Sequence, residues 1–305
     1  MSSPPRRAGA APRRPGAERV RDPERSDPAI KSGGADPAIQ TIGLIGAGRI
    51  GQPIIGHLVR KGFVVVANDV DGLKQEAVEK QGARWAELAE LARDAGAILI
   101  CVGYDRDLRA LMDEGLINKV SAGAIVVVLS TVRPRTMQEL EEIARYKGVA
   151  VVDATMCRGG RAADAGTMLS FVAGDPAVIE RLKPVVAAYS TDIVYTGAVG
   201  TAQVAKAANN LLMWACLIAN HEALALAKRF GVDVELLREA LLKTGADNGV
   251  LRNWGTSTMA WADDDLEIIQ SMAEDAGIAL PQAELNRELC RTLKPRKFRL
   301  DKYGV

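Results

Sequence analysis

The sequence predicts an α/β domain built on a doubly wound parallel sheet, followed by an all-helical domain. Short β-branched runs alternate with helical stretches from residue 41 onward, and the strand signals stop after residue 200. Continuous apolar strands that alternate with helices are typical of a parallel sheet covered on both faces. A chain of 305 residues is long enough for two domains of ordinary size.

The expected elements follow one another along the chain in two groups. In the first domain, 40–196, apolar runs bounded by turn residues predict strands at 41–46, 63–69, 97–102, 124–130 and 149–155. Helical patterns lie between them at 49–61, 72–81, 105–119 and 134–147. In the second domain, 197–305, we expect one long helix over 201–229 and further helices around 236–243 and 266–277.

Residues 1–39 differ in composition from the rest of the chain. They contain about half of the 13 prolines, many arginines and almost no large apolar side chain. Such a segment buries too little apolar surface to offset the entropy cost of ordering it. Its arginine pairs leave a transit peptide or a nucleic-acid tail open, but acidic residues are interspersed and the prolines would break an amphipathic helix. We therefore expect a disordered, flexible extension.

The composition favours a protein that acts on small molecules. The formal net charge is +1, so neither nucleic acid nor an anionic membrane is expected as a partner. No apolar run of about 18 residues predicts a membrane span. Cys101, Cys157, Cys216 and Cys290 have no metal-binding or disulfide spacing, so we expect no metal site and a reducing, cytoplasmic location.

A glycine-rich loop connects the first strand to the first helix. Gly46, Gly48 and Gly51 have the GxGxxG spacing of a Rossmann-type dinucleotide site, in which a pyrophosphate lies at the helix N-terminus. Asp69 ends the next strand, where a carboxylate can accept a hydrogen bond from a ribose 2′-hydroxyl. A 2′-phosphate would meet this negative charge, so NAD is predicted over NADP. The predicted contacts within the loop are Gly46, Ala47, Gly48, Arg49, Ile50 and Gly51.

The stretch VAKAANNLLMWACL, residues 204–217, places a lysine and two asparagines in an otherwise apolar helix. A solvated or snorkelling Lys206 is the structural alternative to a catalytic one. His57 lies in the first helix and His221 about four turns beyond Lys206, so both are poorly placed for acid/base work. No Tyr-x-x-x-Lys pair is present, which excludes a short-chain dehydrogenase.

Four motifs carry a resemblance to a known family. GLIGAGRIG, STVRP at 130–134, DATMCRGGRAADAGTM at 153–168 and GAVGTAQVAKAANN at 197–210 occur in the family's order. The sequence resembles the β-hydroxyacid dehydrogenases, which include 3-hydroxyisobutyrate dehydrogenase and tartronate semialdehyde reductase. The resemblance implies oxidation of a small 3-hydroxy acid with a nicotinamide cofactor, in a homodimer or homotetramer.

The same resemblance implies roles for particular residues. Lys206 is the acid/base, and Asn210, one helical turn away, holds the same hydroxyl; Asn209 lies at the substrate. The nicotinamide side of the cofactor is implied to contact Thr131, Cys101 and Val102.

The motif that receives the substrate carboxylate departs from the family pattern. The family's D-A-P-V-S-G-G is matched by residues 153–159, with Cys157 in place of serine and Arg158 in place of glycine, followed by Gly159. If Arg158 faces inward, it can grip a larger or more acidic substrate; the alternative is a surface arginine. Asp264 occupies the place of a family lysine, and the stretch 245–265 is shorter than usual.

The sequence leaves two other functions open. An imine or other C=N reductase uses the same scaffold, but those relatives generally lack the lysine. A non-catalytic dinucleotide-binding protein would explain Asp264, whereas the presence of Lys206 and Asn210 favours the dehydrogenase.

Overall fold

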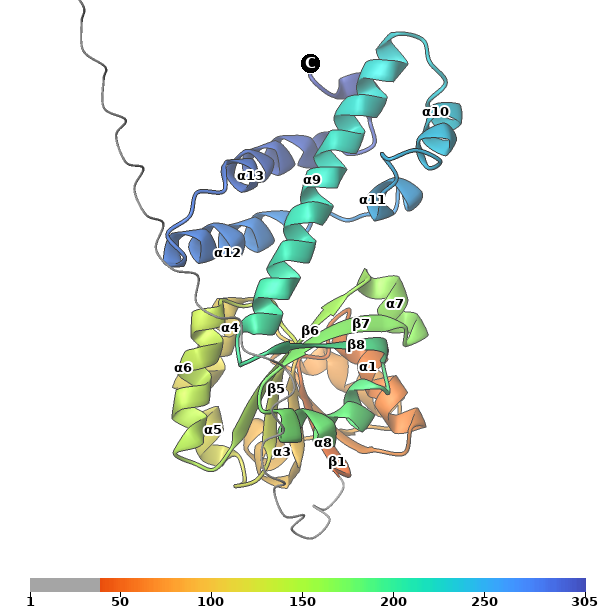
Figure 1. Ribbon diagram of the computed structural model, residues 1–305. Coiled ribbons are helices and arrows are strands. Elements are labelled where there is room, and N and C mark those ends of the chain that lie inside the picture. Colours follow the sequence, from red (N-terminus) through yellow and green to blue (C-terminus); the bar gives the residue numbers. More distant parts are fainter. Residues whose placement is uncertain (1–38) are drawn as a thin grey trace, which may run out of the picture. The chain divides into compact units, whose positions relative to one another are not determined.

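One eight-stranded sheet, in the order β3-β2-β1-β4-β5-β6-β7-β8, forms the first half of the fold in a computed structural model that describes residues 39–305 (Figure 1). Helices cover the sheet, and helices alone follow it, so the predicted fold class is confirmed. The strands are β1 (Thr41–Ile45), β2 (Val64–Asn68), β3 (Arg84–Trp85), β4 (Ala97–Ile100), β5 (Ile125–Val128), β6 (Ala150–Cys157), β7 (Met168–Ala173) and β8 (Ser190–Gly197).

The helices agree with the predicted ones where the apolar period is long. The predicted 201–229 helix is reproduced residue for residue as α9, whereas the predicted 105–119 helix breaks at Gly115, which has a φ of 72°. The helices are α1 (Gly51–Arg60), α2 (Gln75–Glu79), α3 (Leu88–Asp94), α4 (Asp105–Asp113), α5 (Leu116–Lys119), α6 (Pro134–Arg145), α7 (Gly159–Ala165), α8 (Pro176–Val186), α9 (Thr201–Arg229), α10 (Val234–Leu241), α11 (Gly249–Arg252), α12 (Ala262–Asp275) and α13 (Pro281–Leu293). Short 3₁₀ turns are η1 (Gly72–Lys74), η2 (Lys294–Arg296) and η3 (Leu300–Lys302).

The sheet is mostly parallel rather than wholly parallel. Strand β7 runs antiparallel to β6, and β8 pairs in parallel with β7. These two strands and the two-residue β3 were not predicted. In β8 only the first residue is buried, which gives the strand no continuous apolar signal.

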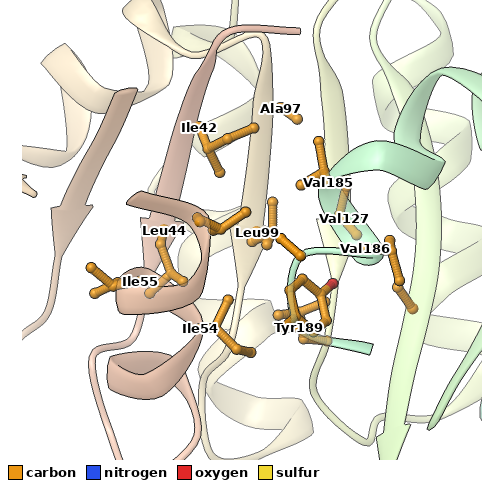
Figure 2. Packing of buried hydrophobic residues seen from close by; sticks show 14 of the residues in the cluster. Ile42, Leu44, Ile54, Ile55, Ala97, Leu99, Val127, Val185, Val186 and Tyr189 are labelled. Atoms are coloured by element: carbon orange, nitrogen blue, oxygen red, sulfur yellow. The ribbon is translucent and has the colours of Figure 1, made fainter. Parts of the chain in front are cut away.

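Alternate residues of each central strand enter two different cores. In β4, Ala97 and Leu99 belong to the cluster beneath α1 and α8, whereas Ile98 and Ile100 belong to the cluster beneath α3–α6. Figure 2 shows Leu99 of the first cluster near residues of β1, α1 and α8. Each fully buried aliphatic side chain stabilises the fold by about 1.5–3 kcal/mol. Two buried faces explain why the strands are apolar without alternation.

The strand order changes direction between β1 and β4. Strand β1 pairs with β2 on one side and with β4 on the other, so the crossover connections leave in opposite directions. In open α/β sheets, ligands bind at the carboxyl ends of the strands at such a switch point. The glycine-rich loop after β1 and residues 101–104 after β4 lie at this edge.

Helix α9 is the central helix of the second half. It packs against β6, β7 and β8 and also against α11, α12 and α13. By length and composition it is the single described helix that could cross a membrane. We interpret it as a core helix because of these contacts. The predicted extension, 1–39, lies outside the described residues except for its last position.

Candidate active site

The glycine-rich loop has the geometry that a dinucleotide requires. Gly46 has a φ of +99°, and a side chain there would collide with the carbonyl oxygen of Cys101. A side chain on Gly51 would collide with the carbonyl oxygen of Gly46. By contrast, a Cβ on Gly48 would meet no protein atom within 4 Å, so its backbone is open to approach by a ligand. These residues fit a bound pyrophosphate at the start of α1.

Asp69 lies at the end of β2 with its carboxylate turned toward the loop. It accepts a hydrogen bond from the backbone N–H of Ala47 at 2.7 Å and from that of Asp71 at 2.9 Å. The ammonium group of Lys74 lies 2.8 Å from the same carboxylate. Asp69 is predicted from the sequence, whereas Lys74 is not, because η1 brings Lys74 back toward the strand only in the fold.

A second buried carboxylate holds the start of α9. Asp153, in β6, is fully buried and accepts hydrogen bonds from the backbone N–H groups of Gly200, Ala202 and Gln203 at 3.1–3.2 Å. Burial raises the pKa of Asp153 to about 6, although these hydrogen bonds oppose the shift. Helix α9 has no side-chain cap of its own, so Asp153 supplies one from across the fold.

Anchored in this way, α9 brings Lys206 to the carboxyl end of β6. The Lys206 ammonium donates a hydrogen bond to the carbonyl oxygen of Met156 at 2.8 Å. One turn later, Asn210 is 1% exposed, and its side-chain oxygen accepts a hydrogen bond from Asn209 at 3.1 Å. Among the described residues, Nδ2 of Asn210 faces the Asp265 carboxylate but makes no hydrogen bond of normal length. A buried donor of this kind is available for a ligand oxygen.

Helix α12 contributes a carboxylate that sequence analysis missed. Asp265 accepts a hydrogen bond from the indole N–H of Trp214 at 3.0 Å and lies beside Asn210. Burial raises the pKa of Asp265, and the nearby Lys206 charge partly offsets this rise. Burial also raises the pKa of the Cys157 thiol, which therefore stays protonated at neutral pH.

The loops after β4 and β5 are linked to α9. The Gln203 side chain accepts from the backbone N–H of Val132 at 3.0 Å and donates to the carbonyl of Ser130 at 3.1 Å. The Ser130 hydroxyl in turn donates to the carbonyl of Val102 at 2.8 Å. These hydrogen bonds connect the start of α9 to the two loops that carry Thr131 and Val102, the predicted nicotinamide contacts. Cys101, the third, has its pKa raised to about 12 by burial and is a neutral thiol.

Arg158 does not face Lys206. Its guanidinium donates to the carbonyl of Thr167, the hydroxyl of Thr191 and the carboxylate of Asp192 at 2.7–3.1 Å. The inward-facing arginine considered from the sequence is therefore not found, because β8, unseen in the sequence, supplies its partners. Its backbone has a φ of 79°, and Gly159 follows with a φ of 70°.

The two histidines make contacts elsewhere. Nε2 of His57 lies 2.9 Å from the carbonyl oxygen of Ala163. His221 is fully buried, with Nδ1 2.7 Å from the carbonyl oxygen of Leu217, and burial lowers its pKa. Neither imidazole ring forms a hydrogen bond with Lys206, Asn210 or Asp265.

Comparisons with known proteins identify the family. Residues 41–197 match the NAD binding domain of 6-phosphogluconate dehydrogenase, and residues 200–301 match the NAD-binding domain of NADP-dependent 3-hydroxyisobutyrate dehydrogenase. The chain belongs to the β-hydroxyacid dehydrogenase family. Members of this family are nicotinamide-dependent dehydrogenases of small hydroxy acids, so the resemblance seen in the sequence is confirmed.

Individual β-hydroxyacid dehydrogenases cover most of the chain. An NAD-dependent L-serine dehydrogenase from Pseudomonas aeruginosa is 30% identical over 259 residues, which is 81% of this chain and 86% of that protein. A 3-hydroxyisobutyrate dehydrogenase from the same organism is 30% identical over 254 residues, 80% of this chain and 85% of that protein. The structure of Mycobacterium tuberculosis 3-hydroxyisobutyrate dehydrogenase with L-serine has a TM-score of 0.78 at 20% identity, and covers 85% of this chain and 95% of that one.

Proposed function

We propose that this protein oxidises a small, 3-hydroxyisobutyrate-like 3-hydroxy acid with NAD. The observation that supports this function is the Lys206 ammonium at the end of β6, one turn from the buried side-chain N–H group of Asn210. An amine and a buried N–H donor on one helix face can hold one substrate oxygen between them. A solvated or purely structural lysine would need no such neighbour.

In the proposed reaction, Lys206 accepts the proton of the substrate hydroxyl while Asn210 donates a hydrogen bond to the same oxygen. A positioned general base contributes about 10²–10⁴-fold to the rate. The bound nicotinamide supplies the hydride acceptor. We assign the substrate carboxylate to the turn at Cys157 and Gly159, where the neutral thiol is a weak donor. Asn209 keeps the amide of Asn210 oriented by its hydrogen bond.

The cofactor preference follows from Asp69. Its carboxylate can accept a hydrogen bond from a ribose hydroxyl, and its charge disfavours a 2′-phosphate. Lys74 weakens this discrimination because it neutralises much of that charge at 2.8 Å. We therefore propose NAD as the main cofactor, with NADP as a weaker one.

The two halves of the chain have separate tasks in this proposal. Residues 40–196 bind the cofactor through the loop 46–51, Asp69 and the loops at Cys101 and Thr131. Residues 197–305 supply Lys206 and the contact between subunits. The cysteines among the described residues are all free, which fits a reducing cytoplasm.

The proposed homodimer or homotetramer is supported by exposed apolar side chains on the helical half. Leu212, Leu226 and Phe230 of the α9 region are 61–82% exposed. A groove of about 420 Å³ lies along α9 and α13, lined by Ile218, Leu285 and others. Exposed large apolar side chains beside an apolar groove favour a surface that is covered by another subunit. Light scattering at micromolar concentration tests the proposal, which a monomer would contradict.

The test of the main proposal compares wild type with Lys206→Ala. Wild type should reduce NAD with at least one acid from a panel of 3-hydroxy acids, and Lys206→Ala should lose about 10²–10⁴-fold in kcat. Its Kd for NADH should stay within about threefold, because Lys206 lies beyond the glycine-rich loop. Lys147→Ala, which changes an exposed lysine just after α6 and away from the proposed subunit contact, is the matched control and should behave as wild type. NADH binding without turnover on any acid would favour a non-catalytic or C=N reductase function instead.

A further inference from the structure

Helix α7 packs against α1, and this contact joins two parts of the proposed active site. Helix α1 begins at the glycine-rich loop that we assign to the cofactor, whereas α7 follows the turn at Cys157 and Gly159 that we assign to the substrate carboxylate. Two side chains of the first segment, Arg49 and His57, bind α7 directly. The cofactor loop and the substrate turn are therefore connected through these two residues.

Arg49 forms an ion pair with Asp164 through two parallel hydrogen bonds. Its terminal nitrogens donate to the two carboxylate oxygens at 2.7 and 2.6 Å, across 115 residues of the chain. This hydrogen bonding raises the pKa of Arg49 and lowers the pKa of Asp164, so both groups are charged at neutral pH. A paired arrangement of this kind fixes the angle as well as the distance between its partners. The Arg49 backbone belongs to the cofactor loop, next to Gly48, where a ligand can approach.

Two glycines of the α7 segment leave space for these side chains. A Cβ on Gly160 would lie 2.7–3.0 Å from the guanidinium atoms of Arg49. A Cβ on Gly166 would lie 2.7 Å from the His57 ring. Both distances are well below the separation of about 3.5–4.0 Å at which carbon contacts are favourable. Arg49 therefore packs directly on the backbone of Gly160, which follows the substrate turn.

His57 provides a second attachment, one residue away from the first. Its Nε2 lies 2.9 Å from the carbonyl oxygen of Ala163, and its Nδ1 lies 2.8 Å from a guanidinium nitrogen of Arg60. Because a guanidinium only donates hydrogen bonds, Nδ1 accepts one, and Nε2 of the neutral ring donates to Ala163. Helix α7 is thus held at two successive residues, Ala163 and Asp164.

The ion pair between Arg49 and Asp164 contributes little to the stability of the fold. Its side chains are 59% and 54% exposed, and ion pairs in contact with water are weak because solvent screens them. The pair does, however, determine where the substrate turn lies relative to the cofactor loop. A turn that is not held in place must be ordered when the substrate binds, and this cost weakens binding. We therefore expect the pair to act on substrate binding more than on unfolding.

We propose that Arg49 and Asp164 are positioning residues through which the bound cofactor orders the substrate turn. Pyrophosphate binding immobilises the loop 46–51, the ion pair transmits this order to α7, and the turn at Cys157 and Gly159 is then preorganised for the acid. The acid accordingly binds the cofactor-loaded protein more tightly than the free protein, and by linkage it strengthens cofactor binding by the same factor. This inference rests on the proposed dehydrogenase function for the role of the turn. Neither side chain takes part in proton transfer.

The experiment compares variants of the ion pair with a control of the same kind. The variants are Arg49→Gln, Asp164→Asn, their combination, and Arg49→Lys, which keeps the charge but loses the paired geometry. Arg145→Gln is the matched control, because it removes an exposed arginine from another surface ion pair, at the end of α6. Thermal unfolding establishes that each protein is folded, and fluorescence titration gives its Kd for NADH.

Amide hydrogen exchange measures the coupling without any substrate. Saturating NADH should slow exchange across residues 157–167 about fivefold or more in wild type and in Arg145→Gln. The slowing should be lost in Arg49→Gln and Asp164→Asn and partly retained in Arg49→Lys. The Kd for NADH should stay within about threefold of the wild-type value in every variant, because the backbone of the cofactor loop is unchanged.

Steady-state kinetics with the best acid of the panel measures the consequence for the reaction. Arg49→Gln and Asp164→Asn should each raise KM about three- to tenfold, with kcat changed less than about threefold. The double variant should be no worse than either single variant, because the two side chains act as one unit.

Three results would overturn the inference. Equal slowing of exchange by NADH in wild type and variants, or no slowing in wild type, would show that the cofactor does not order the turn through this pair. Additive effects of the two substitutions on KM would show that the residues act separately. A tenfold loss of NADH affinity in Arg49→Gln, without any effect of Asp164→Asn, would make Arg49 a cofactor ligand instead.

One further result separates the inference from the dehydrogenase assignment. If hydrogen exchange responds to NADH and to the variants as expected while wild type turns over no acid, the coupling between loop and turn is supported and the dehydrogenase function is contradicted.

Discussion

The carboxylate of Asp153 accepts the backbone N–H of Gly200, 47 residues later, at 3.1 Å from each oxygen. This contact holds the start of α9 against the sheet. It therefore determines where the Lys206 side chain lies relative to the carboxyl end of β6. The position of the proposed acid/base thus depends on a residue that touches neither substrate nor cofactor.

Asp153→Ala should therefore lower both stability and turnover. The variant leaves the buried N–H groups of Gly200, Ala202 and Gln203 without acceptors, which costs about 2–4 kcal/mol of unfolding free energy. Urea unfolding measures this loss, and kcat should fall at a temperature where the variant is still folded. An unchanged denaturation midpoint would contradict the capping role.

The Asp153 carboxyl should make the free energy of unfolding depend on pH, and the direction of its pKa shift determines the sign of this dependence. Its folded pKa, about 6, lies above the value of about 3.9 for an unfolded aspartate, so the folded state binds the proton more tightly. Its contribution to stability is complete below about pH 4 and decreases as the pH rises through 6, by about 3 kcal/mol in all. The stability difference between wild type and Asp153→Asn should follow this decrease between pH 4.5 and 7.5; a constant difference would contradict it.

Two glycines of the loop should respond differently to alanine. Gly51→Ala should lose about 1–3 kcal/mol of stability, because the new Cβ collides with the carbonyl of Gly46. Gly48→Ala should keep wild-type stability, because its Cβ meets no protein atom within 4 Å. It should nevertheless bind NADH at least tenfold more weakly, since the methyl group occupies the path of the pyrophosphate. Thermal unfolding and NADH fluorescence titration separate the two effects.

Lys74 should control the choice between the two cofactors. In Lys74→Gln the charge of Asp69 is uncompensated, so NADPH affinity should fall about tenfold while NADH affinity changes less than about threefold. Asp69→Asn should shift the preference in the opposite direction. Parallel titrations with NADH and NADPH give the ratio of the two affinities. If this ratio is unchanged in both variants, the ribose 2′-position of the cofactor does not lie at Asp69 and Lys74.

Arg158→Ala should change kcat/KM by less than about threefold. The side chain is bound to Asp192 at the sheet edge and is 44% exposed, so its ion pair contributes only about 0–1 kcal/mol. Steady-state kinetics on the best acid measures the effect. A loss of tenfold or more would mean that the arginine turns toward the substrate when the cofactor is bound.

The sequence by itself determined the central sheet, the helices with a long apolar period and the glycine-rich loop. Strands β1, β2, β4, β5 and β6 are buried on both faces, and this burial requires apolar runs that are visible in one dimension. Gly46 and Gly51 are likewise required by local backbone geometry. For α9 a stretch without glycine or proline runs from 201 to 230 between Gly200 and Gly231, which explains why both of its ends were predicted correctly.

Only the tertiary structure decided that β7 pairs antiparallel to β6, that the Arg158 side chain binds Asp192 at the sheet edge, and that a carboxylate lies near Lys206. Each depends on contacts between residues far apart in sequence, such as Arg158 with Asp192, Asp153 with Gly200 and Asp265 with Trp214. No periodicity encodes such a pair, because a hydrogen bond or an ion pair needs only two side chains at the right distance. The fold supplies that distance, and so it decides which charges surround the lysine that the sequence had already singled out.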